Sequence, residues 1–173
     1  MSQAKYDVVS RVIHWLVAIG IFTLIGIGIS FSYVTNTECH NMLLYVHKST
    51  ALTVFFLMVI RVFWRLKYMY IPEYQPEISN ANRTIGHIAH MLIYIGVFIM
   101  IFSGWIGSSV LGYPVPFWFV NLALPLPINP NFGMIMFEVH EITIWILGTI
   151  IALHILGVIH HTFKKEKILE RML

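Results

Sequence analysis

The chain alternates between four long apolar stretches and shorter segments rich in charged and turn-forming residues. The apolar stretches lie roughly at residues 8–32, 42–67, 83–110 and 134–163. Each can cross the hydrocarbon core of a bilayer, which takes about 20 apolar residues as a helix. The pattern therefore predicts a single all-α domain, residues 1–173, that forms an integral membrane four-helix bundle.

The composition changes this picture little and excludes several classes of protein. Hydrophobic residues make up 58% of the chain and charged residues only 11%, against about 25% charged residues in soluble domains. No small-residue cleavage site follows the first apolar stretch, so we expect a retained helix and not a signal peptide. The single cysteine, Cys39, excludes an internal disulfide and an iron–sulfur cluster ligated by this chain alone. No pattern indicates binding to nucleic acid.

The distribution of lysine and arginine predicts how the chain is oriented. These residues gather at the start of the chain, between the second and third stretches, and at the end, with only Lys48 on the opposite side. Positive residues favour the cytoplasmic side. We therefore expect a multi-pass protein of the bacterial inner membrane with both termini in the cytoplasm. The uncharged, proline-rich connection 112–133 is predicted to form an interfacial layer over the bundle without a regular helix.

Eight histidines lie in or at the ends of the apolar stretches, whereas His40 precedes the second stretch and is expected to be solvated. They are His14, His47, His87, His90, His140, His154, His160 and His161. A single histidine in a helix bundle usually hydrogen-bonds a neighbouring helix. Eight of them favour a different explanation, because each unpartnered polar ring in lipid costs several kcal/mol.

The spacing of the histidines points to two stacked planar metal cofactors. His140 and His154 are fourteen residues apart, which places them about 40° from alignment and about 21 Å apart along one helix. His47 enters the second helix near His140, and His14 enters the first helix on the side of His154. Zinc or copper would require three or four ligands at one depth, and no C-x-x-C-H motif attaches a c-type haem. Two bis-histidine b haems are the prediction.

The same fourteen-residue step recurs on the other helices. It leads from His14 to Gly28, from His47 to Arg61 and from His90 to Gly104. Glycine allows a porphyrin to approach a helix closely, so we expect Gly28 beside the outer haem and Gly104 in a similar role. Arg61 either binds a haem propionate or extends to the cytoplasmic interface, and both interpretations stay open.

The inner ligand on the fourth helix also has two candidates. His161 matches the depth of His14 better than His154 does and shares nearly the same helix face. We favour His154, because a helix can extend beyond the lipid and Arg11 is then a poor marker of depth. His160 and His161 are left for quinone, propionate or interfacial hydrogen bonds.

With these residues, the chain resembles the prokaryotic cytochrome b561 family over nearly its whole length. The resemblance is carried by "HWLVAIGI" (14–21), "VHKSTALTVFFLMVIRVFWRLKY" (46–68), "GHIAHMLIYIGVFIMIFSGWIGSS" (86–109), "FEVHEI" (137–142) and "LHILGVIHHTF" (153–163). It implies a four-helix bundle with two b haems, one held by His47 and His140 and the other by His14 and His154. It also implies electron exchange with ubiquinone or menaquinone. Related cytochrome b subunits serve hydrogenases and formate dehydrogenases.

Several functions remain open at this point. His87 and His90 share a face of the third helix and are candidates for quinone or proton exchange, as are His160, Arg61 and Arg65. Alternatives are the oxidation of periplasmic superoxide, for which Lys48 is the local cation, and an electron-transfer subunit that docks a redox protein through residues 112–133. A structural, non-redox bundle is a further alternative. We therefore expect an oxidoreductase or an electron carrier, and the sequence assigns no catalytic residues. Assembly with further copies of the same chain is one more expected interaction.

Overall fold

Four long helices build the molecule, and a short hairpin and a terminal 3₁₀ turn complete it. The computed structural model describes residues 5–68 and 78–173. In order, its elements are α1 (Val8–Ser30), α2 (Thr37–Tyr68), α3 (Asn80–Val110), β1 (Pro116–Phe117), β2 (Val120–Asn121), α4 (Pro130–Phe163) and η1 (Leu169–Arg171). Each α-helix contains a window whose mean hydropathy is between 1.7 and 2.4, long and apolar enough to cross a membrane. The predicted all-α integral membrane bundle is confirmed.

The helices begin where a polar side chain accepts a hydrogen bond from the first turn. The Asn129 side chain accepts from the backbone N–H of Phe132 and Pro130 occupies the first turn, a position where its missing N–H costs nothing. α4 therefore begins before the residue 134 expected from hydropathy. The prediction that prolines keep the whole of 112–133 out of a helix was wrong at its last residues.

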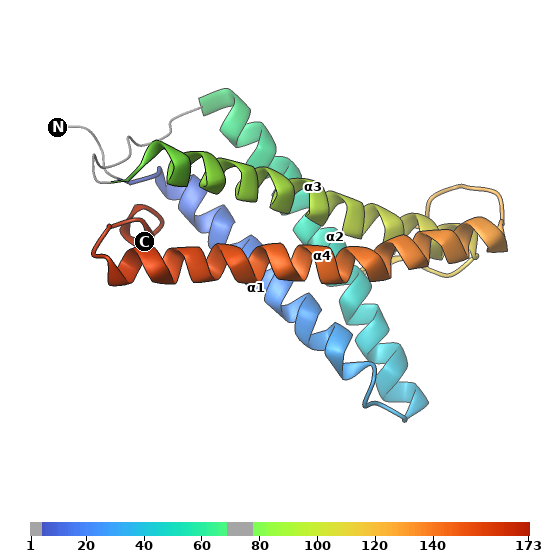
Figure 1. Ribbon diagram of the computed structural model, residues 1–173. Helices are drawn as coiled ribbons and strands as arrows, with labels where there is room; N and C mark the ends of the chain where they lie inside the picture. The colour runs from blue at the N-terminus through green and yellow to red at the C-terminus, as the bar shows by residue number, and fades with distance from the viewer. Residues whose placement is uncertain (1–4, 69–77) are drawn as a thin grey trace.

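The helices form two antiparallel pairs that cross each other (Figure 1). α1 packs along α2, and α3 packs along α4. The buried core at the crossing takes residues from all four helices: Ile13, Val17, Val54, Met58, Val97, Ile101 and Leu147. Leu147 lies seven residues from both His140 and His154. The apolar core therefore separates two levels of histidines along the bundle.

The two ends of the bundle differ in construction. At one end, here called the loop end, the connection between α3 and α4 packs on α2: the indole N–H of Trp118 donates to Thr53 over 3.0 Å, and Ser49 Oγ donates to the Pro116 carbonyl over 3.2 Å. At the other end, here called the terminal end, the chain beyond α4 returns to the start of α1, where the backbone N–H of Tyr6 donates to the Arg171 carbonyl. The start of α1 and the end of the chain after η1 both lie at this terminal end (Figure 1).

Asp7 ties the first two helices together at the terminal end. Its carboxylate caps α1 by accepting from the backbone N–H and the hydroxyl of Ser10, and it accepts from the Trp64 indole of α2 over 3.1 Å. Partial burial by itself raises the pKa of Asp7, but these hydrogen bonds outweigh that effect and leave the pKa below its usual value. The carboxylate therefore stays charged and holds α1 on α2.

We expect Gly20→Ala to destabilise the bundle because α2 packs directly against α1 at this position. A Cβ at Gly20 would lie 2.5 Å from Cγ2 of Val54, a buried β-branched side chain with few rotamers available. The expected loss is about 1–3 kcal/mol in the free energy of unfolding, measured by thermal unfolding in detergent. Gly26→Ala is the control, since its Cβ meets no atom within 4 Å. Equal stability of the two variants would contradict close packing at Gly20.

Candidate cofactor sites

The loop-end site is formed by two histidines that face each other from different helix pairs. His47 comes from α2 and His140 from α4, and their ring centroids lie 6.4 Å apart. In metal–histidine bonds the metal lies about 2 Å from the ring nitrogen. Two imidazoles that bind one metal from opposite sides therefore have their ring centres about as far apart as these two rings. The two rings are thus spaced as two axial ligands of one metal would be.

Helix α3 fixes the orientation of the His140 ring. His140 Nδ1 lies 2.8 Å from the backbone carbonyl of Met100, and because a carbonyl can only accept, Nδ1 carries the proton. Nε2 is then the unprotonated nitrogen with a lone pair for a metal. A backbone carbonyl on the other ring nitrogen is a frequent partner of metal-binding histidines.

Two further residues of α3 complete the surroundings of His140, and the sequence analysis missed this role for both. Ser103 is buried, donates to the Met100 carbonyl over 3.0 Å and places its oxygen 3.3 Å from His140 Nδ1. A Cβ at Gly104 would lie 3.1 Å from Cε1 of the His140 ring. Gly104 therefore leaves space for the histidine itself, which differs from the expected contact with a porphyrin. The only sequence signal for this part of α3 was the fourteen-residue spacing between His90 and Gly104.

The other predicted residues of the loop end are placed as follows. Phe31, at the end of α1, packs on His47 with ring centroids 5.7 Å apart. His47 Nδ1 is buried and has no hydrogen-bond partner among the described residues. A Cβ added at Gly28 would meet no atom within 4 Å, so there is open space beside α1 at this position. Lys48, the local cation in the superoxide alternative, donates to the Pro114 carbonyl over 2.8 Å and lies over the Tyr113 ring.

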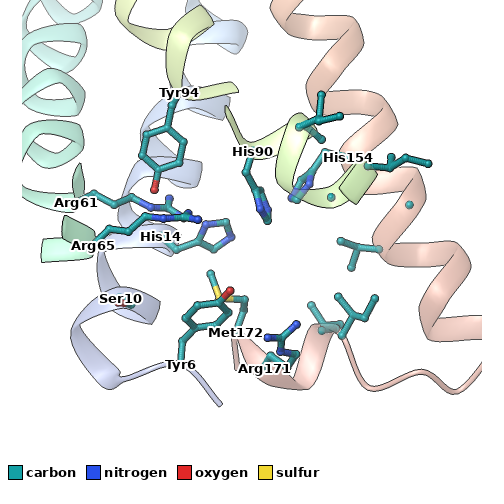
Figure 2. A pocket seen from close by; sticks show the side chains of 18 of the residues that line it. Tyr6, Ser10, His14, Arg61, Arg65, His90, Tyr94, His154, Arg171 and Met172 are labelled. Atoms are coloured by element: carbon teal, nitrogen blue, oxygen red, sulfur yellow. The ribbon is translucent and has the colours of Figure 1, made fainter. Parts of the chain in front are cut away.

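A cavity of about 520 Å³ occupies the terminal end of the bundle, within the size range of small-molecule and cofactor sites. Figure 2 shows the rings of His14, His90 and His154 directed into it from α1, α3 and α4. The rings of His90 and His154 lie 5.0 Å apart, and His14 Nδ1 is a buried nitrogen without a hydrogen-bond partner in the described chain. The cavity therefore gathers histidines from three helices.

Arg61 lines this cavity. Its guanidinium carbon lies 5.3 Å from the centroid of the Tyr94 ring, and both residues line the cavity with Arg65 (Figure 2). A guanidinium in this position favours an anionic ligand, and a carboxylate matches its geometry. Of the two interpretations of Arg61, the placement supports anion binding.

The remaining candidate histidines differ in their relation to the cavity. His161 lines it and pairs through Nδ1 with the Glu166 carboxylate. His160 is exposed, stacks its ring edge on His161, and is absent from the cavity lining. His87 is also exposed and outside the lining, so the shared face expected for His87 and His90 does not bring both to one site.

Replacing Gly104 with valine should displace the His140 ring and weaken cofactor binding at the loop end. The added side chain would enter the space that the ring now occupies, and the Met100 hydrogen bond would be strained. We expect a lower haem content and an altered absorption spectrum in the purified protein. The matched control is Gly148→Val on α4, whose Cβ meets nothing within 4 Å. Identical spectra for both variants would show that Gly104 does not position His140.

Comparisons with known proteins agree with this geometry. The model of the family described as prokaryotic cytochrome b561 matches residues 5–173. Cytochrome b561 homolog 2 of Escherichia coli (strain K12) is 25% identical over 181 residues, which cover 99% of this chain and 93% of that protein. The four membrane-spanning helices are in keeping with this family. The chain belongs to the prokaryotic cytochrome b561 family, and it is a multi-pass membrane protein that binds haem b and transfers electrons.

Proposed function

We propose that this protein relays electrons across the bacterial inner membrane between a membrane quinone and a second redox partner. Two b haems carry the electrons, one held at the loop end by His47 and His140 and one at the terminal end by His14 and His154. Both chain termini are cytoplasmic in this proposal, so the terminal-end haem lies toward the cytoplasm. A haem b with two histidine ligands takes up and releases single electrons and leaves no position for oxygen.

The observation that carries the proposal is the geometry of the loop-end pair. The ring separation of 6.4 Å fits two axial ligands, and the Met100 carbonyl selects the tautomer of His140 that can bind iron. The hydrogen bond to Met100 also raises the basicity of the ligand. The hydroxyl of the buried Ser103 donates to the same Met100 carbonyl. This second hydrogen bond adjusts how strongly the carbonyl accepts from His140.

The assignment of His14 and His154 to the terminal-end haem is supported by how the histidines of α4 are spaced about the apolar core. His154 lies as many residues beyond Leu147 as His140 lies before it, and it faces the same cavity as His14. His161 is held by Glu166 in the turn that follows α4. We therefore assign His154 to the iron and His161 to exchange with substrate.

Quinone exchange is assigned to the rim of the terminal-end cavity. Oxidation of a quinol releases two electrons and two protons, and the reverse reaction takes up the same numbers. A haem held by His14 and His154 would take up or supply these electrons one at a time, and the protons need a group at the rim that accepts and donates them. The His161–Glu166 pair is such a group, and it connects the cavity to the aqueous side of the turn. We propose His90, which lines the same cavity, as a hydrogen-bond partner of the quinone or of the haem carboxylates.

Alanine variants of the histidines test the ligand assignment. His47→Ala and His140→Ala should lose one haem, and His14→Ala and His154→Ala should lose the other, because a removed axial ligand leaves the iron with one protein bond. His90→Ala and His161→Ala should retain both. The readouts are the pyridine haemochrome content per chain and the redox difference spectrum. Loss of a haem in His161→Ala, or wild-type protein with well under two haems, would contradict the assignment.

The quinone site is tested by the rate of haem reduction after mixing with a quinol. His161→Gln should slow this step by roughly 10-fold or more, since general acid–base groups contribute at least this much. His160→Gln is the control, because it removes the neighbouring histidine, which is outside the cavity lining. Haem content should be unchanged in both variants. Equal rates for the two would remove the proton-transfer role of His161.

A further inference from the structure

The loop-end histidines belong to different helix pairs, so their separation depends on what joins the two pairs at this level. α2 packs along α1 and α4 packs along α3, and His47 and His140 face each other across the boundary between the pairs. The connection between α3 and α4 crosses this boundary, because its hairpin, residues 116–121, lies on α2. This hairpin is therefore a candidate for setting how the two rings meet.

Trp118, at the turn of the hairpin, holds the hairpin on α2. Its backbone N–H donates to Ser49 Oγ over 3.2 Å, its indole N–H donates to Thr53 Oγ1 over 3.0 Å, and its carbonyl accepts from the Tyr45 hydroxyl. These α2 residues are four apart and form one stripe on the helix. His47 lies two residues from both Tyr45 and Ser49, which is about 200° around the helix. The hairpin thus holds α2 from the side opposite the histidine.

The backbone of Trp118 adopts a conformation that tryptophan disfavours. Phe117 pairs with Val120 across the hairpin, which leaves a two-residue turn. Trp118 is the first residue of that turn and has a φ of 51°, where glycine is the usual residue and a bulky side chain strains the backbone. Such strain persists where surrounding contacts hold the residue. Because the Trp118 side chain is 41% exposed, the hydrogen bonds to α2 are the contacts that compensate the strain.

The chain after the second strand of the hairpin is held by α3, on the segment that also holds His140. The indole N–H of Trp105 donates to the Leu122 carbonyl over 2.7 Å. Five residues before Trp105, the Met100 carbonyl lies 2.8 Å from His140 Nδ1. One short segment of α3 therefore fixes both the His140 ring and the base of the hairpin, and the turn of the hairpin fixes the helix that carries His47.

We propose that Trp118 is a positioning residue for the loop-end haem, because its turn holds α2 at the distance and rotation at which His47 meets His140. The inference rests on the proposed function, since it requires one haem between these two histidines. The rings are 6.4 Å apart, with their planes at 69° to each other, and the hairpin sets both values. Tryptophan is kept at a position that suits glycine because its indole N–H reaches Thr53.

The test compares Trp118→Gly with Phe119→Gly, which removes the other aromatic side chain of the same turn. Glycine suits the φ of residue 118, so the turn should form without the indole. Phe119 is 100% exposed, so its variant controls for the added backbone freedom.

The readout is the electron paramagnetic resonance spectrum of the oxidised protein, because the signal of a bis-histidine haem depends on the angle between the imidazole planes. The loop-end signal is identified by its loss in His47→Ala. Trp118→Gly should shift this signal and leave the terminal-end signal unchanged, and Phe119→Gly should change neither.

A second pair of variants tests the indole hydrogen bond alone. Thr53→Val removes the acceptor of the Trp118 indole. Thr23→Val removes an exposed hydroxyl of α1 that, like the Thr53 hydroxyl, donates to the backbone carbonyl four residues earlier. Thr53→Val should shift the loop-end signal in the same direction as Trp118→Gly, by a smaller amount, and Thr23→Val should retain the wild-type spectrum.

Identical spectra for Trp118→Gly and Phe119→Gly would overturn the proposal. An equal shift of both haem signals in Trp118→Gly would also overturn it, since a general loosening of the bundle gives that result. Should Trp118→Gly fail to accumulate in membranes, Thr53→Val and Thr23→Val decide the matter, and equal spectra of these two would overturn the proposal. Failure of the proposed function is distinguishable, because wild-type protein with well under two haems contradicts the relay before any hairpin variant is compared.

Discussion

The fold depends on how polar imidazole and guanidinium groups are compensated inside a bundle that lipid surrounds. Lipid offers no hydrogen-bond partner, so each buried ring nitrogen must find one within the protein or on a cofactor. His140 finds the Met100 carbonyl, whereas Nδ1 of His14 and of His47 has no such partner in the described chain. In the proposed relay, a cofactor bound by the other nitrogen of each of these rings would offset the remaining cost of burial. The apolar crossing around Leu147 then separates the two places where this occurs.

The helices and the histidine pattern were predictable from the sequence, because both depend on period and spacing along a single element. Four apolar stretches set the number of helices, and the fourteen-residue step between His140 and His154 set two levels. Helix starts were less predictable, since Asn129 and Pro130 extend α4 beyond its apolar stretch. Hydropathy does not record a cap, and three of the four predicted stretches were therefore shorter than the helices that contain them.

The residues missed by the sequence analysis act across helices or through the backbone. The Met100 carbonyl has no side-chain signature, and the contact between Gly104 and His140 depends on how closely α3 approaches α4. Arg171 resembled one more cytoplasmic positive charge in a basic tail until the reversal at Lys165 placed it under the cavity. Position along the chain was a good guide to a residue's level along its helix and a poor guide to which groups of different helices meet at that level.

The crossing of the two helix pairs has a consequence for biogenesis. α1 and α2 form one hairpin, and α3 and α4 form the other. Each proposed haem takes one ligand from the first hairpin and one from α4, the last of the four helices to leave the ribosome. Neither iron can therefore acquire both ligands until α4 has inserted, and the first hairpin must wait in the membrane with His14 and His47 unligated. Haem loading is then a late event that fastens two independently inserted hairpins to each other.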